Sequence, residues 1–257
     1  MNRAPPADWL VPDWRVPGVG ALMTTRNGGV SGAPFDTMNL RREVGDDAVA
    51  VEANCELLAR ACGARPVYLD QVHGARVLRL EAGDYVPTQS ADASVTTAPG
   101  IACAVQVADC LPVLFAASGA RAVGAAHAGW RGLAGGVLEA TLAELCRAAD
   151  CAPADVDAWL GACIGPGHFE VGADVLKAFH AKADGSRPDH FRPSGTGKWL
   201  ANLPQLARDR LQAAGVARIA GGTWCTFEDA SRFFSYRRNR LTGRMVAAVW
   251  IEPGRSH

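Results

Sequence analysis

The sequence lacks an excess of charge of either sign, since 26 basic residues balance 26 acidic ones. Without a basic stripe, a nucleic-acid partner has no electrostatic support. The chain also lacks an uncharged apolar run long enough to cross a bilayer, and its first eight residues lack the apolar core of a secretion signal. We therefore expect a cytoplasmic protein that binds neither nucleic acid nor a membrane.

The eight cysteines include no Cys-x-x-Cys pair, which argues against a zinc knuckle or a redox dithiol. Most of them lie in apolar, alanine-rich segments, where a free cysteine behaves as a small buried hydrophobe. Disulfides are not expected in a cytoplasmic protein. We therefore interpret seven cysteines as packing residues and single out Cys110.

No repeat or obvious linker divides the 257 residues, and 49% of them are hydrophobic, so we predict a single domain over 1–257. Helical periodicity and short apolar segments bounded by turns predict its elements. Helices are expected at 46–62, 134–149, 172–182 and 203–215, and strands at 20–25, 66–72, 75–81, 101–107, 111–117, 121–127, 156–162, 218–224 and 244–251. Strands outnumber helices and do not alternate with them, so the predicted class is α+β, with mixed or antiparallel sheets and outer helices.

Three local signals mark the ends of these elements. Asp46 is a candidate N-cap and Gly63 a stop for the first helix, and the last helix starts after Asn202. Residues 184–197 gather glycine, proline, serine and threonine, which predicts the longest polar loop.

His73, Cys110 and His127 each stand in a short motif with apolar borders, near the end of a predicted strand. Two imidazoles and one thiolate make three zinc ligands, and a fourth position left open is typical of a catalytic zinc site. His73 alone, at an expected hairpin turn, would be an ordinary surface histidine. The hypothesis depends on the three residues together.

Other polar residues surround this triplet in the sequence. Asp109 precedes Cys110 and is a candidate to orient a metal-bound histidine, to accept a proton, or simply to cap a turn. Arg131 follows His127 in a glycine-rich turn that leads into a helix, a natural anion site. Gln71 shares a face with His73 in an extended chain.

Three further segments are candidates to complete the pocket: 24–29, 90–94 and 235–238. The first contains Arg26, for which an ordinary solvated surface position is equally expected, and the second contains Asp92. Arg238 and Arg240 are expected on the solvated surface. The remaining histidines show no partner motif and are expected to be structural or surface residues: His168, His180, His190 and His257.

At these motifs the chain closely resembles the YfiH/YlmD family, also called laccase-domain or polyphenol oxidase proteins. The resemblance is carried by Thr25–Ser31, Asp70–Gly74, Ala108–Val113, Ala125–Gly132, Gly165–Pro166 with Phe169–Val171, and Phe233–Arg238. It implies a layered α+β sandwich and a zinc site on His73, Cys110 and His127. The fold is grouped with toxin deamidases that use a cysteine and a histidine, so the resemblance also keeps Cys110 as a candidate nucleophile.

Family members have been described under three activities. They are purine nucleoside phosphorylases that also deaminate adenosine and cleave methylthioadenosine, copper-dependent polyphenol oxidases, or peptidoglycan-editing factors. A multicopper cluster needs about ten ligands, mostly histidine, and the chain has six histidines. A single copper could still replace zinc, because copper outcompetes it at most nitrogen and sulfur ligands.

We therefore predict a zinc-dependent enzyme that acts on purine nucleosides and phosphate. Asp109 and Cys110 are its candidate catalytic residues, and Arg26, Gln71, Asp92 and Arg131 its candidate substrate-binding residues. A copper-type phenol oxidase and a hydrolase of peptidoglycan precursors are the alternatives. The sequence gives no signal for an oligomeric state.

Overall fold

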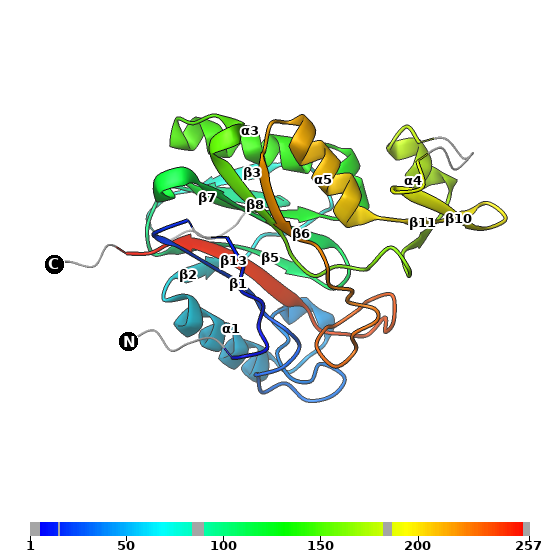
Figure 1. The fold of residues 1–257 in the computed structure, drawn as a ribbon. Coiled ribbons are helices and arrows are strands. Elements are labelled where there is room, and N and C mark those ends of the chain that lie inside the picture. The colour runs from blue at the N-terminus through cyan, green and yellow to red at the C-terminus, as the bar shows by residue number, and fades with distance from the viewer. Residues whose placement is uncertain (1–5, 15, 84–89, 182–186, 254–257) are drawn as a thin grey trace.

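Two β-sheets packed face to face form the centre of the computed structural model, which describes residues 6–14, 16–83, 90–181 and 187–253 (Figure 1). The larger sheet has the strand order β12 (Arg218–Gly221), β8 (Val156–Leu160), β6 (Leu111–Ala117), β7 (Val123–Ala128), β4 (Ala93–Thr96) and β3 (Val77–Leu80). The smaller has the order β1 (Val19–Met23), β13 (Met245–Ile251), β5 (Ile101–Val107) and β2 (Arg65–Val67). Both contain parallel and antiparallel pairs.

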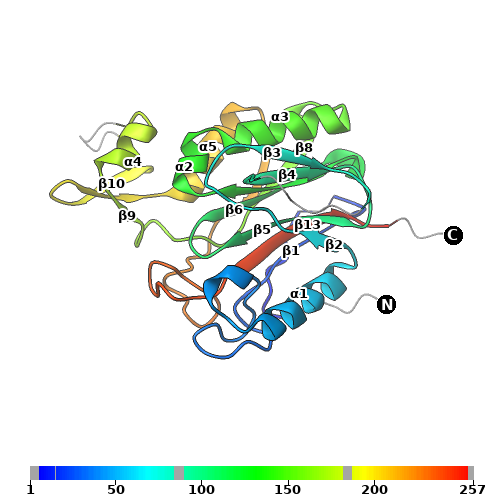
Figure 2. The same cartoon turned by 180° about the vertical axis from the view of Figure 1, so that it is seen from behind.

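Helices cover the outer faces of this sandwich, as Figure 2 shows from behind. Helices α3 (Val137–Ala149) and α5 (Leu203–Ala213) lie over the six-stranded sheet, and α1 (Ala48–Cys62) lies over the four-stranded one. Apolar side chains fill one layer between the sheets and one beneath each helical layer. The predicted α+β class and the layered sandwich with outer helices are confirmed.

A smaller unit projects from one side of the sandwich (Figures 1 and 2). It contains α4 (Ala173–Ala178) and a three-stranded sheet ordered β10 (Phe191–Gly195), β11 (Lys198–Ala201) and β9 (Glu170–Val171). The predicted polar loop over 184–197 is therefore wrong where β10 forms, and its residues 184–186 lie outside the described part of the chain. The predicted helix at 172–182 shortens to α4, and residue 182 also lies outside that part.

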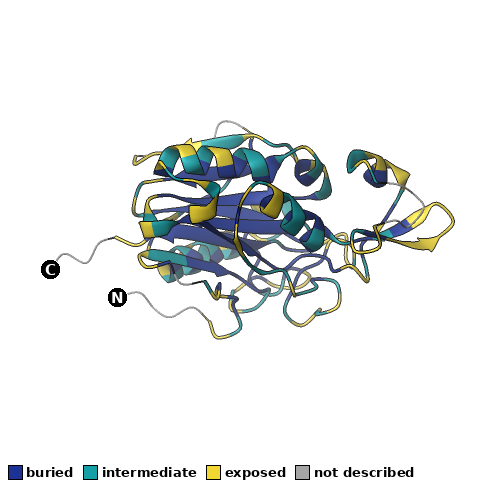
Figure 3. Cartoon of the chain, turned by 45° about the horizontal axis from the view of Figure 1, so that its top comes forward, coloured by how far each residue is buried: buried dark blue, intermediate teal, exposed yellow. Residues whose placement is uncertain are grey.

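Burial explains why the central strands are so apolar. Every residue of β5 and β6 is buried, because each strand has a packed layer on both faces (Figure 3). Their predicted bounds, 101–107 and 111–117, match the structure. The antiparallel pairing of β13 with β5 places Ala247 opposite Val105 and continues the core across the smaller sheet.

The segment between β2 and β3 differs most from the prediction. The expected strands 66–72 and 75–81 shrink to Arg65–Val67 and Val77–Leu80, and they belong to different sheets rather than to one hairpin. Residues 68–76 therefore cross from the smaller sheet to the larger one. This crossing carries His73 to the edge of the sandwich.

Helix ends follow local capping. Asp47 rather than Asp46 caps α1, since its carboxylate accepts from the amides of Val49 and Ala50 at 3.4 and 3.2 Å, and Gly63 ends the helix in the left-handed conformation. The helix predicted at 134–149 corresponds to α3, which starts at Val137, and a separate single turn, α2 (Trp130–Ala134), precedes it. No described helix is long and apolar enough to span a membrane.

Candidate metal centre

His73, Cys110 and His127 reach one point from three segments of the chain. His73 lies in the crossing, Cys110 in the turn between β5 and β6, and His127 in β7. Their ligand atoms all lie within 4.8 Å of one another, and the Cys110 Sγ is 3.7 Å from the His73 Nε2. Tetrahedral zinc with ordinary bond lengths would separate a nitrogen and a sulfur ligand by about 3.6 Å. The donor set therefore fits a zinc ion.

Asp92 holds two of these ligands in place from behind. Its buried carboxylate accepts hydrogen bonds from the amides of Val72, His73 and Gly74 at 3.2, 2.9 and 2.6 Å. It also contacts the His127 Nδ1 at 2.8 Å, which leaves the Nε2 of that ring for a metal. Burial opposes ionisation of Asp92, but the bonds from His127 and the amides outweigh it and lower its pKa.

Charge favours the metal-binding form of the thiol. Burial raises the pKa of Cys110, but the positive charge of His127 and hydrogen bonds from both histidines bring this pKa down to about 6. Burial acts to lower the pKa of His127, but the Cys110 thiolate and Asp92 outweigh this effect, so the pKa of His127 is raised overall. These contacts therefore favour the thiolate of Cys110, which is the form that binds metals.

Two glycines allow the backbone to approach the ligands. A Cβ atom at Gly129 would lie 2.8 Å from the His73 Cδ2 and 2.9 Å from the Cys110 Sγ. A Cβ at Gly132 would lie 2.8 Å from the carbonyl oxygen of Gly74. The glycines in the turn after His127 therefore serve close packing of α2 against the His73 segment.

Comparison with known proteins places this site in a family. The model of the family described as multi-copper polyphenol oxidoreductase laccase matches residues 20–252. The chain is 46% identical over 245 residues to a purine nucleoside phosphorylase of Pseudomonas aeruginosa, covering 95% of this chain and 98% of that one. It is 47% identical over 245 residues to purine nucleoside phosphorylase YfiH of Escherichia coli K12, covering 94% and 98%.

Two solved structures share the fold over nearly their whole length. A Neisseria meningitidis protein superposes with a TM-score of 0.88 at 44% identity, covering 96% of this chain and 100% of that one. YlmD from Geobacillus stearothermophilus superposes with a TM-score of 0.87 at 32% identity, covering 95% and 96%. The chain belongs to the YfiH/YlmD family. The predicted resemblance is confirmed.

Within this YfiH/YlmD site, Asp109 bonds other residues than the histidine that it was a candidate to orient. Its Oδ1 accepts from the Thr226 hydroxyl and its Oδ2 from the Arg237 amide, each at 2.6 Å. Its backbone is left-handed, with φ 98°. Asp109 therefore ties the turn beside Cys110 to a distant segment, and Asp92 orients the histidine instead.

The side-chain amide of Gln71 forms hydrogen bonds with the backbone of β5, although Gln71 was a candidate to bind substrate. Its Nε2 donates to the Gln106 carbonyl at 2.9 Å, and its Oε1 accepts from the Gln106 amide at 2.8 Å. The side chain thus anchors the crossing to the smaller sheet, two residues before His73.

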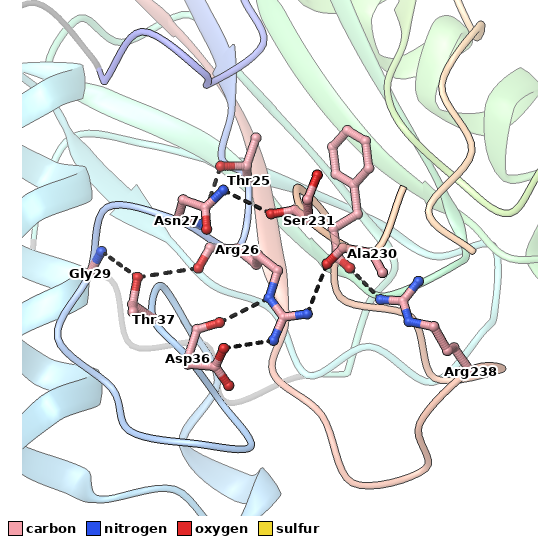
Figure 4. A network of polar contacts seen from close by, with 10 residues as sticks. Thr25, Arg26, Asn27, Gly29, Asp36, Thr37, Ala230, Ser231 and Arg238 are labelled. Atoms are coloured by element: carbon pink, nitrogen blue, oxygen red, sulfur yellow. Dashed lines mark hydrogen bonds and ion pairs between the residues drawn. The ribbon is translucent and has the colours of Figure 1, made fainter. Parts of the chain in front are cut away.

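Arg26 links two loops, as Figure 4 shows. Its guanidinium donates to the carbonyl and carboxylate of Asp36 at 2.9 and 3.0 Å and to the Ala230 carbonyl at 3.0 Å. Only 17% of its side chain is exposed. Arg238, expected on the solvated surface, is half-buried instead and donates to three backbone carbonyls, including that of Thr226 at 2.7 Å.

Two arginines are candidate cations for this site: Arg131, four residues after His127, and Arg244, whose charge interacts with that of Cys110. Arg131 is exposed and lies 4.2 Å above the Trp130 ring, in a helix of five residues rather than in the predicted glycine-rich turn before the long helix. Burial lowers the pKa of the half-buried Arg244, and the negative charges of Cys110 and Asp109 oppose this shift. The sequence analysis missed Arg244, whose only signal was its place just before β13.

Proposed function

We propose that the chain is a zinc-dependent purine nucleoside phosphorylase whose metal ligands are His73, Cys110 and His127. The observation that carries the proposal is the convergence of these three donors. It is supported by the matches over nearly the whole chain to relatives named purine nucleoside phosphorylase. Adenosine deamination and methylthioadenosine cleavage belong to the same proposal.

The surroundings of the ligands suit a catalytic ion better than a structural one. Three protein ligands leave one position for a substrate or water, whereas structural zinc sites use four protein ligands. A zinc ion bound there supplies Lewis acidity at the open position. His73 is exposed and Cys110 is partly exposed, so this side of the site is open to solvent.

Residues around the ligands supply the remaining proposed roles. Arg131 and Arg244 are the proposed partners of phosphate, because arginine pairs well with phosphate oxygens. Arg131 lies four residues after His127 in the sequence, and the charge of Arg244 interacts with that of Cys110. Asp109 is the proposed proton acceptor, held in orientation by Thr226 and Arg237. Arg26, Gln71 and Asp92 act through their structural contacts, so we propose that they shape the pocket rather than touch the nucleoside.

The description of the matching family supports copper-dependent phenol oxidation as the second candidate. A multicopper cluster needs about ten ligands, mostly histidine, whereas the chain contains six histidines. Within the described residues, the possible metal ligands gather in two groups of three. Oxidase activity would therefore require a single copper at the proposed zinc site.

Chromatography of adenosine and inosine incubated with zinc-loaded, copper-free protein tests the proposal. We expect purine base and ribose 1-phosphate when phosphate is present, inosine from adenosine when it is absent, and no oxidation of phenols. Cys110→Ser should abolish these reactions and most zinc binding, while the matched variant Cys146→Ser, in α3, should retain both. An absence of purine products, alongside phenol oxidation with added copper, would overturn the nucleoside function in favour of the oxidase.

A further inference from the structure

A second group of nitrogen, sulfur and oxygen donors lies outside the site described above. His168 stands in the loop before β9, and Cys225 and Glu228 stand in the turn after β12, with their ligand atoms within 4.8 Å of one another. We propose that His168, Cys225 and Glu228 bind a second divalent metal ion of the zinc class. This proposal does not depend on the nucleoside reaction.

The three side chains are already arranged around a common point. The His168 Nε2 lies 2.8 Å from the Glu228 Oε1, a contact that a metal would replace with two bonds. The His168 ring stacks on Phe227, with ring centres 4.6 Å apart and an angle of 22° between planes, which limits rotation of the imidazole. The donor types are those that zinc prefers.

The Cys225 sulfur has the surroundings of a metal ligand. The Gly165 amide donates to its Sγ at 3.1 Å, the kind of outer hydrogen bond that orients and tunes ligands. A Cβ at Gly165 would lie 3.0 Å from this sulfur, so the glycine permits the approach. Cys225 and Glu228 are three residues apart in one turn, a spacing that brings two side chains to one side.

Arginines fix the backbone of both ligand segments. Arg237 donates to the His168 carbonyl at 3.4 Å, and Arg238 donates to the carbonyls of Thr226 and Phe227 at 2.7 and 2.9 Å. Their positive charges oppose a cation nearby, and the site is partly exposed. We therefore expect the second ion to bind more weakly than the first.

An ion at the second site would affect the first site, because Thr226 connects the two. Thr226, between the two ligands of the turn, donates its hydroxyl to Asp109 at 2.6 Å. Its amide donates to the Cys163 carbonyl at 2.9 Å. An ion on Cys225 and Glu228 would therefore stiffen the turn that holds Asp109, the neighbour of Cys110.

Titration with cadmium separates the two sites, because cadmium bound to a thiolate gives an ultraviolet charge-transfer band. The double variant Cys110→Ser/His127→Ala removes two ligands of the first site. We expect this protein to bind one further equivalent of cadmium with a thiolate band. Adding Cys225→Ser should remove the band, whereas adding Cys146→Ser should leave it unchanged.

Glu228→Gln, an exposed substitution of the same shape, is the second test in the same background. It should reduce cadmium affinity about tenfold or more, the loss expected even for an outer partner of a metal ligand, while far-ultraviolet circular dichroism stays unchanged. Absence of a thiolate band in the double variant would overturn the proposal. Persistence of the band after Cys225→Ser, or an unchanged affinity in Glu228→Gln, would also overturn it. None of these readouts uses enzymatic activity.

Discussion

Replacing Asp92 with asparagine tests how the first metal site is built. In the structure, Oδ1 faces the His73 amide and the His127 Nδ1, and Oδ2 faces the amides of Val72 and Gly74. An asparagine has one oxygen and one NH₂ group. In either orientation of the asparagine side chain, its NH₂ group faces two N–H donors that bond a carboxylate oxygen in the parent protein. Those two donors lose their acceptor.

The size of the effect follows from those lost bonds. A buried donor left without a partner costs about 1–3 kcal/mol, so two of them should lower the free energy of unfolding by at least about 2 kcal/mol. Loss of the carboxylate behind a ligating histidine typically reduces metal affinity about 10–100-fold, which is about 1.4–2.7 kcal/mol of binding free energy. We expect Asp92→Asn to show both effects.

Competition with a chromophoric chelator gives the zinc affinity, at a temperature where circular dichroism shows the variant to be folded. Asp70→Asn is the matched control, because Asp70 bonds the exposed Ser90 hydroxyl at 2.6 Å and touches neither ligand. A folded Asp92→Asn protein with the zinc affinity of the parent and a raised KM for nucleoside would refute this reasoning. That outcome would make Asp92 a substrate contact, as the sequence suggested.

Three further predictions concern the site. Gly129→Ala places a Cβ 2.9 Å from the Cys110 Sγ and 2.8 Å from the His73 Cδ2. Elemental analysis should therefore show that this variant loses most of its zinc. Gly32→Ala, at an open position, should keep its zinc. Arg131→Ala should raise the KM for phosphate more than the KM for inosine in steady-state kinetics, and equal effects would remove Arg131 from the phosphate site. Chelation should abolish activity and leave far-ultraviolet circular dichroism near native, because a chain of this size has its own core; global unfolding would make the ion structural.

The long buried elements of the fold could be predicted from the sequence. The strands at 101–107 and 111–117 are almost continuously apolar because both of their faces are covered. Strand β4 was missed, because Ala93–Thr96 is short and half polar and its burial depends on neighbours distant in sequence. The strand predicted at 66–72 ends at Val67, and the amide of Val72 bonds Asp92 rather than a neighbouring strand.

The metal ligands could be found because histidine and cysteine are recognisable as possible ligands from their residue type alone. The role of Asp92 could not, since it depends on the pairing of β4 with β7. That pairing places Ala93 opposite Ala126 and so brings residue 92 beside His127. The same reason hid the contact between His168 and Glu228, which lie on separate loops. The sequence therefore shows which residues can bind a metal, whereas the topology of the fold determines which other residues hold those ligands in position.

The ligands of the first site lie on buried strands or beside them, so the fold holds them whether or not a metal is bound. His127 is part of β7, Cys110 joins two fully buried strands, and the segment of His73 is tied to Asp92. A preformed site accepts a metal without refolding, and among divalent ions copper binds nitrogen and sulfur ligands more tightly than zinc does. We therefore expect the metal supplied during expression to decide which ion occupies the site. Protein prepared with zinc alone should then show phosphorolysis without phenol oxidation, and protein prepared with copper alone should show the reverse.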